Sequence, residues 1–176
     1  GPMGAAREPD LDGVVLALAG LRRLELDGHV SEILSADSRT GAPVMVPAAA
    51  QGALAVETRD SLDREDPQLA QVLADLDDPA TRAAATAERA VLARLGAGCA
   101  APVGALARLT VEGGDALRLE AVVAALDGRT VLRESAVGPL SEAQVLGTRV
   151  AQALLTAGAT RVADLRAGSV SRKDLR

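Results

Sequence analysis

The chain has 176 residues, of which 48% are hydrophobic and 24% charged, and it contains no Phe, Tyr or Trp. Its core must therefore be built from aliphatic side chains, and stacking of nucleic-acid bases on aromatic rings is excluded. The net charge of −5 argues against nonspecific binding to nucleic acid or to an anionic membrane. One Cys and one His cannot form an internal disulfide or a structural zinc site, so no metal is expected. This cysteine content, with no spanning segment or secretory signal in view, favours a cytoplasmic protein.

The first third of the chain contains short apolar runs separated by loops. Residues 12–19 (DGVVLALA) predict a buried strand that passes into one helical turn at 20–24. A short helix is expected from Asp27 to Leu34, followed by a loop over 35–44 and a second short strand over 53–57. Strands this isolated need a sheet supplied from elsewhere, so their edges favour pairing with a second copy or with another polypeptide.

Two amphipathic helices are predicted next, over 67–76 and 78–95. The second begins with an N-cap and a proline, Asp78-Pro79, and ends at Gly96-Ala97-Gly98. Its apolar positions share one face, which holds Ala83, Ala87, Ala90, Val91 and Leu95. Its charged residues are expected to decorate the remaining surface: Arg82, Glu88, Arg89 and Arg94.

Beyond the second helix the apolar period changes to two, which indicates antiparallel strands. Three strands are expected, over residues 103–112, 116–126 and 130–137. Gly113-Gly114 and Asp127-Gly128 supply the hairpin turns. A further helix opens at Ser141 and ends before Gly158, and a short element follows over 160–165. The fold class is therefore α+β, a small antiparallel three-stranded sheet with helices on one face.

Three places are candidates for chemistry. Cys99 lies among small residues directly after the second helix, and it is either an accessible thiol at a loop tip or a small buried hydrophobe. Arg22-Arg23 either clamps carboxylates or forms a solvated helix face. The Gln51-Gly52 turn offers a backbone N–H to an anion.

Three ordered motifs resemble those of one family. Residues 12–24 (DGVVLALAGLRRL) resemble the pattern DAxxLAxAGLxRL, and residues 47–57 (PAAAQGALAVE) resemble PAxGQGALxxE. Residues 87–105 (AERAVLARLGAGCAAPVGA) are similar to AERAxLxxLxGGCxxPxGA. These are motifs of the porphobilinogen deaminase (hydroxymethylbilane synthase) family, and the resemblance covers about residues 9–165.

The resemblance implies a role in tetrapyrrole (heme) biosynthesis. The family enzyme is a transferase that condenses four porphobilinogen molecules into hydroxymethylbilane, with loss of ammonia at each addition. By resemblance, Cys99 forms the thioether to the dipyrromethane cofactor. Arg23 pairs with acetate or propionate carboxylates of the cofactor or substrate, while Gln51 and Gly52 line the cleft. The ligand expected is therefore porphobilinogen or an oligopyrrole.

The chain departs from the family pattern in length. The family's first half, which holds its catalytic aspartate and most substrate-binding arginines, has no counterpart here, so no catalytic residue is assigned and the isolated chain is expected to be inactive. An alternative is a truncated homologue that acts as a pyrrole-binding or protein-interaction module, either as a homodimer or paired with a separate N-terminal half. Ala50 also replaces the usual Gly before Gln51, and Ala97-Gly98 the usual Gly-Gly before Cys99. A turn that needs positive φ is restricted by Ala50.

The resemblance also suggests a division of the chain. Gly1-Pro2 before Met3 is typical of a protease-cleavage scar. Four parts are expected: a tag scar and lead-in over 1–8, segments resembling the end of the family's second domain and the return of its first over 9–60, the C-terminal cofactor-cysteine domain over 61–168, and a disordered tail over 169–176.

Overall fold

The computed structural model describes residues 11–36, 45–111 and 113–166. The expectations for residues 1–8, for the tail over 169–176 and for most of the loop over 35–44 fall outside these residues. The chain divides into two compact units, Gly1–Val44 and Met45–Arg176, and each is described here by itself.

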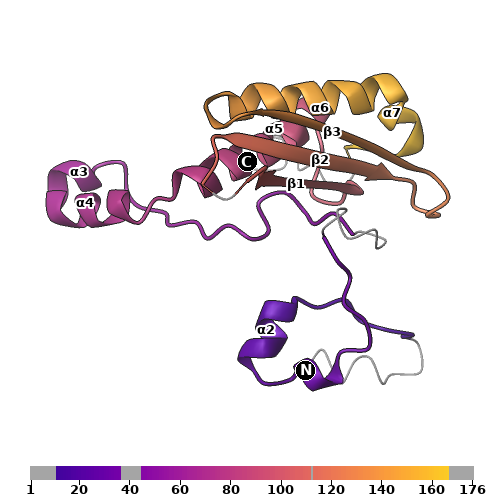
Figure 1. Cartoon of the computed structure of the whole chain (residues 1–176), viewed down its shortest axis with the longest axis horizontal. Coiled ribbons are helices and arrows are strands. Elements are labelled where there is room, and N and C mark those ends of the chain that lie inside the picture. Colours follow the sequence, from indigo (N-terminus) through magenta and orange to yellow (C-terminus); the bar gives the residue numbers. More distant parts are fainter. Residues whose placement is uncertain (1–10, 37–44, 112, 167–176) are drawn as a thin grey trace, which may run out of the picture. The chain divides into compact units, whose positions relative to one another are not determined.

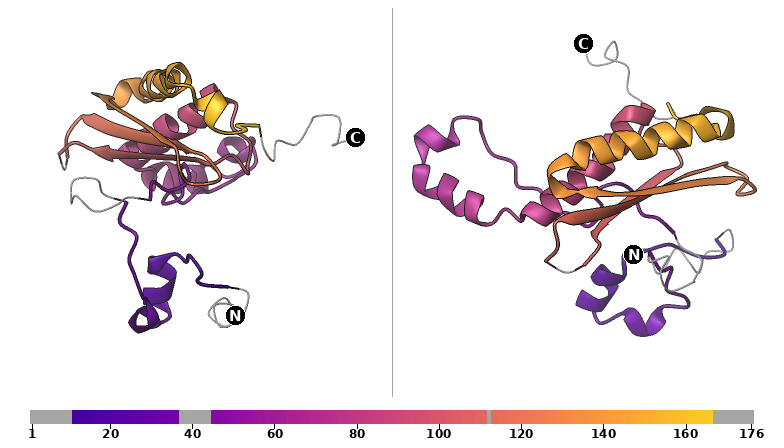
Figure 2. Two further views of the ribbon diagram at one scale, coloured as in Figure 1. Left: turned by 90° about the vertical axis from the view of Figure 1, so that its right-hand side faces the viewer. Right: turned by 45° about the horizontal axis from the view of Figure 1, so that its top comes forward.

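The larger unit is built on an antiparallel sheet of three strands, with helices on one face (Figures 1 and 2). The strands lie in the order β1-β2-β3 and span Val103–Leu109, Ala116–Ala124 and Val131–Pro139. Helix α5 (Pro79–Leu95) packs mainly on β1, and α6 (Ala143–Ala157) packs on β2 and β3. The predicted α+β class and its three strands are confirmed.

The core lies between the sheet and these two helices. Every second residue of β2 is fully buried on this side, namely Leu117, Leu119, Ala121 and Val123. The intervening residues Arg118 and Glu120 lie on the opposite face. The two-residue period is thus that of a half-buried strand, and the hydrophobic cluster between the layers consists of aliphatic side chains.

The helix boundaries follow local capping signals. Asp78 accepts a hydrogen bond from the Thr81 N–H at 2.6 Å, Pro79 follows it, and α5 ends at Gly96 in the left-handed conformation with φ 64°. Helix α6 likewise ends at Gly158, at φ 104°. The shorter helical elements of this unit are α3 (Leu62–Glu65), α4 (Pro67–Asp75), the 3-10 turn η3 (Leu140–Glu142) and α7 (Ala159–Val162). Both amphipathic helices are therefore confirmed, as is the helix that ends before Gly158.

Helices α5 and α6 approach closely at Gly147. A Cβ atom built at this glycine would lie 2.2 Å from the Ala87 carbonyl oxygen and 2.6 Å from the Ala90 Cβ. No side chain fits there unless the two backbones separate. The contact between the helices therefore depends on glycine at this position.

Residues 45–50 run along the outer edge of β1. The Ala105 N–H donates to the Pro47 carbonyl oxygen at 2.9 Å, and Val46 is buried against Gly104. A Cβ at Gly104 would lie 2.4 Å from the Val46 oxygen, so the two backbones touch here. This segment precedes the whole C-terminal domain in sequence, yet it belongs to the packing of its sheet.

The two isolated strands predicted in the first third of the chain are wrong. Residues 12–17 and 53–57 contain no strand, and residues 18–23 form α2 (Leu18–Arg23). The helix expected from Asp27 to Leu34 is only one 3-10 turn, η1 (Asp27–His29). Within 11–36 no described residue is buried. An apolar segment becomes a strand only when a neighbouring strand pairs with its backbone N–H and C=O groups, and among the described residues no strand pairs with these two segments.

Candidate functional site

Cys99 lies on a short, anchored loop between α5 and β1. Its side chain is exposed, so it is not a small buried hydrophobe. The Gly98 N–H donates to the Leu165 carbonyl oxygen at 2.8 Å, and the Ala101 N–H donates to the Gly98 oxygen at 3.0 Å. These bonds fix the loop immediately before and after the thiol. The arrangement presents a reachable sulfur on a rigid base with small neighbours, which suits covalent attachment of a bulky group.

A second feature of the same unit is the turn over residues 48–52. The Gln51 N–H donates to the Ala48 oxygen at 3.2 Å, and the Ala53 N–H donates to the Ala50 oxygen at 3.1 Å. Ala50 has a φ of 59°, the left-handed conformation that normally favours glycine. The restriction expected at Ala50 is therefore confirmed, because a residue with a side chain holds a backbone conformation that normally favours glycine. Gln51 and Gly52 are exposed at the tip.

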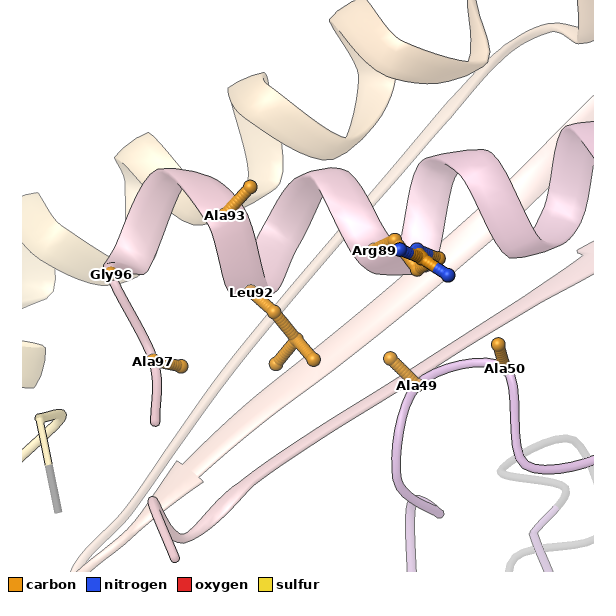
Figure 3. A pocket seen from close by; sticks show the side chains of 7 residues that line it. All are labelled: Ala49, Ala50, Arg89, Leu92, Ala93, Gly96 and Ala97. Carbon is orange, nitrogen blue, oxygen red and sulfur yellow. The ribbon is translucent and has the colours of Figure 1, made fainter. Parts of the chain in front are cut away.

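A hollow of about 440 Å³ separates this turn from the C-terminal half of α5 (Figure 3). One wall comes from the turn, and the other comes from the last turns of α5 and the loop that leads to Cys99. The lining residues are Ala49, Ala50, Arg89, Leu92, Ala93, Gly96 and Ala97. Gln51 follows the lining residue Ala50 directly, and Cys99 lies two residues beyond Ala97. The hollow thus brings the neighbourhoods of two predicted site residues together.

The one buried charged residue of the described chain is Glu88 on α5, which is only 6% exposed. It was expected on the outer surface of the helix, and that expectation is wrong. One carboxylate oxygen accepts from the Ala50 N–H at 2.6 Å and the other from the Ala107 N–H at 2.7 Å. Burial raises the pKa of Glu88, and these two N–H donors act in the opposite direction.

The spacing of residues along the helix predicts that Glu88 is buried, although its charge suggests an exposed position. Val91 and Leu95 lie three and seven positions further along the helix, on the same face as Glu88. By spacing alone this position faces the core. A carboxylate there implies fixed donors, and those donors come from segments that no local pattern connects to the helix.

Arg23 belongs to the smaller unit, whose described part contains only α2 and η1. Arg22 and Arg23 are exposed and occupy the last turn of α2, where positive charge is favoured by the helix dipole. Gln51, Gly52 and Cys99 all belong to the larger unit. The assignment of Arg23 to a carboxylate stays a prediction.

Two features of the described residues bear on other kinds of site. No three His, Cys, Asp or Glu side chains there lie close enough to hold a metal ion. No helix in the same ranges is both long enough and apolar enough to cross a bilayer.

Comparison with known families identifies both parts of the chain. Residues 82–156 match the model for "Porphobilinogen deaminase, C-terminal domain". Residues 3–67 match the model for "Porphobilinogen deaminase, dipyromethane cofactor binding domain". Cys99 and Glu88 fall in the first match, whereas Arg23, Gln51 and Gly52 fall in the second.

Curated relatives agree. A porphobilinogen deaminase from Cutibacterium acnes is 49% identical over 174 residues, which is 93% of this chain and 50% of that protein. One from Mycobacterium avium is 50% identical over 157 residues, or 85% of this chain and 46% of the relative. Porphobilinogen deaminase 1 from Streptomyces avermitilis is 46% identical over 163 residues, covering 89% of this chain and 47% of the relative.

These matches define the class first: a protein whose larger unit holds an α+β domain of the kind that the first family model describes. The chain belongs to the porphobilinogen deaminase family. It spans about half the length of the curated relatives that it matches.

Proposed function

We propose that this chain is the cofactor-carrying portion of a porphobilinogen deaminase, with Cys99 as the attachment point for dipyrromethane. The observation that carries the proposal is the hollow of about 440 Å³, because the turn that bears Gln51 and the loop that bears Cys99 both contribute to its walls. Dipyrromethane is a flexible pair of pyrroles, and an open, mostly apolar hollow beside an exposed thiol suits it. When bound, this group supplies the pyrrole end to which porphobilinogen units are joined.

The chain's own residues bind and orient in this proposal. Cys99 holds the cofactor through a thioether, and the exposed Gln51 side chain and Gly52 backbone at the tip of the turn face its polar substituents. Arg23 pairs with an acetate or propionate carboxylate. Among the described residues that line the hollow there is no Asp or Glu. The nearby carboxylate of Glu88 accepts backbone bonds through both oxygens. We therefore propose that the chain alone does not turn over porphobilinogen, because no group is poised for proton transfer.

Intact-mass spectrometry tests the attachment. The purified chain is incubated with hydroxymethylbilane, and the expected result is a mass increase equal to hydroxymethylbilane less one water, with a positive Ehrlich colour reaction; the first two pyrroles of this adduct are the dipyrromethane. The new sulfur–carbon bond replaces the thiol S–H bond and the carbon–oxygen bond of the hydroxymethyl group, and water leaves. Cys99→Ser is the matched control and should gain no mass, because a serine oxygen is a far weaker nucleophile than a thiolate. An unchanged mass for the unsubstituted chain would refute the proposal, and turnover of porphobilinogen would refute the predicted inactivity.

A second proposed role is pairing with a separate N-terminal half of the enzyme. Its support is the exposure of apolar side chains in segments with no sheet around them: Leu54 is 99% exposed, and Val15 and Val56 are each 69% exposed. Exposed apolar runs of this kind mark interaction surfaces. Light scattering of the chain alone and mixed with the N-terminal half of a family member distinguishes a monomer, a homodimer and a two-chain enzyme. Restored turnover in the mixture would favour the last.

The reduced thiol that attachment requires fits a cytoplasmic location.

A further inference from the structure

We propose that Glu88 is a positioning residue, whose carboxylate fastens the turn over residues 48–52 to the C-terminal domain and so sets where Gln51 and Gly52 lie beside the hollow. The consequence for pyrrole binding rests on the proposed function. The hold on the turn itself does not, because it follows from contacts within this chain.

One carboxylate joins three separate segments. Glu88 projects from α5, its Oε2 accepts from the N–H of Ala50 in the turn, and its Oε1 accepts from the N–H of Ala107 in the edge strand β1. The two residues it bridges are far apart in the sequence. Because Ala107 and α5 belong to the packed core, the bond to Ala50 ties the turn to a rigid body.

The chemistry of the site requires a carboxylate. Both partners are N–H donors, so both side-chain oxygens must be acceptors, which the two oxygens of a carboxyl group provide and a side-chain amide does not. In Glu88→Gln the amide retains one acceptor and turns an NH₂ group toward the other donor. Glu88→Asp keeps both acceptors but is shorter by one methylene. No described buried side-chain nitrogen or oxygen is left without a partner, so the native arrangement is fully satisfied.

The clamp acts where the backbone is strained. Ala50 is held at φ 59°, and the N–H that Glu88 accepts is that of Ala50 itself. A left-handed conformation costs an L-residue free energy and persists only where the surroundings enforce it. Glu88 supplies that enforcement, and the conformation in turn directs Gln51 and Gly52 outward.

Other contacts keep residues 45–47 in place without Glu88. The bond from the Ala105 N–H to the Pro47 oxygen and the contact of Val46 with Gly104 do not involve the carboxylate. Loss of the clamp should therefore loosen the turn while its base stays docked. This separates positioning from a general role in folding.

Amide hydrogen exchange by NMR at neutral pH tests the proposal on the whole chain without a ligand. The variant is Glu88→Gln, and its control is Glu142→Gln, an exposed glutamate that makes no capping bond. We expect the glutamine to keep its bond to the fully buried Ala107 N–H and to release the part-buried Ala50 N–H, because an unpaired buried donor is more costly. Exchange at Ala50 should accelerate about tenfold or more, while the amides of α6 and the Glu142→Gln protein stay unchanged.

Backbone chemical shifts give a second readout that a merely structural role would not move. In Glu88→Gln the Cα shifts of residues 48–52 should move away from values typical of a positive φ at residue 50. In the Ala50→Gly background this effect should shrink, since glycine holds a positive φ without enforcement. Unchanged exchange at Ala50 and unchanged turn shifts in Glu88→Gln would overturn the proposal, whatever happens at Ala107.

The same proteins separate this proposal from the proposed function. If Cys99 gains the pyrrole adduct in every variant but exchange and shifts in the turn are unchanged in Glu88→Gln, the positioning role is wrong and the attachment role stands. If no variant gains mass but Ala50 responds, the attachment role fails and the hold of Glu88 on the turn stands.

Discussion

The described part of the smaller unit, residues 11–36, and the C-terminal domain from α5 onward use the same aliphatic residues with opposite results. In residues 11–36 no described side chain is buried, and Val15 is 69% exposed. In the domain Leu117, Leu119, Ala121 and Val123 are fully buried along one strand. Composition does not explain the difference. An apolar segment becomes part of a core only where another layer of the structure packs against it. Helices α5 and α6 form that layer for the three-stranded sheet.

The C-terminal domain also covers its own strand edges with side chains. Glu88 from α5 accepts from the Ala107 N–H of β1, and Arg149 from α6 donates to the Val137 carbonyl oxygen of β3 at 2.7 Å. Exposed edge groups invite unwanted pairing. Both outer strands are thus partly closed by the helices that cover the sheet, a protection that has no equivalent within residues 11–36.

Removing one large apolar side chain from each region tests the difference in burial between them most directly. Leu119→Ala should cost about 2–5 kcal/mol of unfolding free energy, because it empties a fully buried site. Val15→Ala, its counterpart in residues 11–36, should leave the urea midpoint unchanged. Equal losses for the two variants would mean that residues 11–36 contribute to the same cooperative core.

Adding a methyl group to a glycine tests the contrast in the opposite direction. Gly147→Ala should cost about 1–3 kcal/mol or more, because the new Cβ meets the backbone oxygen of Ala87 on the facing helix. Gly20→Ala in α2 meets nothing within 4 Å, so it should be neutral or slightly favourable to the helix. Urea denaturation measures both. A tolerated Gly147→Ala would show that α5 and α6 separate more easily than their contact indicates.

Helix capping gives a smaller effect. Asp78→Ala removes the bond to the Thr81 N–H and should lower Tm by a few degrees, since α5 is the central helix of the core. Asp27→Ala in η1 removes no capping bond and should leave Tm unchanged. Circular dichroism melting curves measure both Tm values. A larger decrease in Tm for Asp27→Ala than for Asp78→Ala would contradict the prediction.

The smallest expected effect is a pH dependence specific to the C-terminal domain. Because burial raises the pKa of Glu88 above its ordinary value of 4.5, the folded chain binds this proton more tightly than the unfolded chain. The stabilising contribution is complete below pH 4.5 and is lost as the pH rises through the raised pKa. The stability difference between the unsubstituted chain and Glu88→Gln should therefore be larger near pH 4.5 than near pH 7. A difference that grows with pH would contradict the direction of the shift.

How far the sequence predicts the fold depends on whether the partner of each element lies nearby in the chain. Asp78-Pro79 and Gly96 fix the limits of α5, and Asp127-Gly128 lies between β2 and β3, so these elements are readable locally. Residues 12–19 have an equally apolar pattern, but it cannot reveal whether a neighbouring strand exists.

The candidate site divides in the same way. The small residues around Cys99 left an exposed thiol as one of two alternatives, and the structure decides for it. Ala50 before Gln51 indicated a strained turn, because that follows from residue type at one position. The clamp by Glu88 could not be predicted, since it joins a helix to two donors that approach it only after folding. That Arg89 lines the hollow was missed for the same reason.

The close contact between Val46 and Gly104 affects how the protein can be divided. The family resemblance places the start of the C-terminal domain at residue 61. An expression fragment that starts there would expose the β1 edge and leave the Ala105 N–H without its acceptor, the Pro47 oxygen. Such an edge is a template for intermolecular sheet growth, with insolubility as the practical result. A fragment that starts at Met45 keeps the edge covered, so the smallest soluble piece should begin well before the first residue of its own helices and strands.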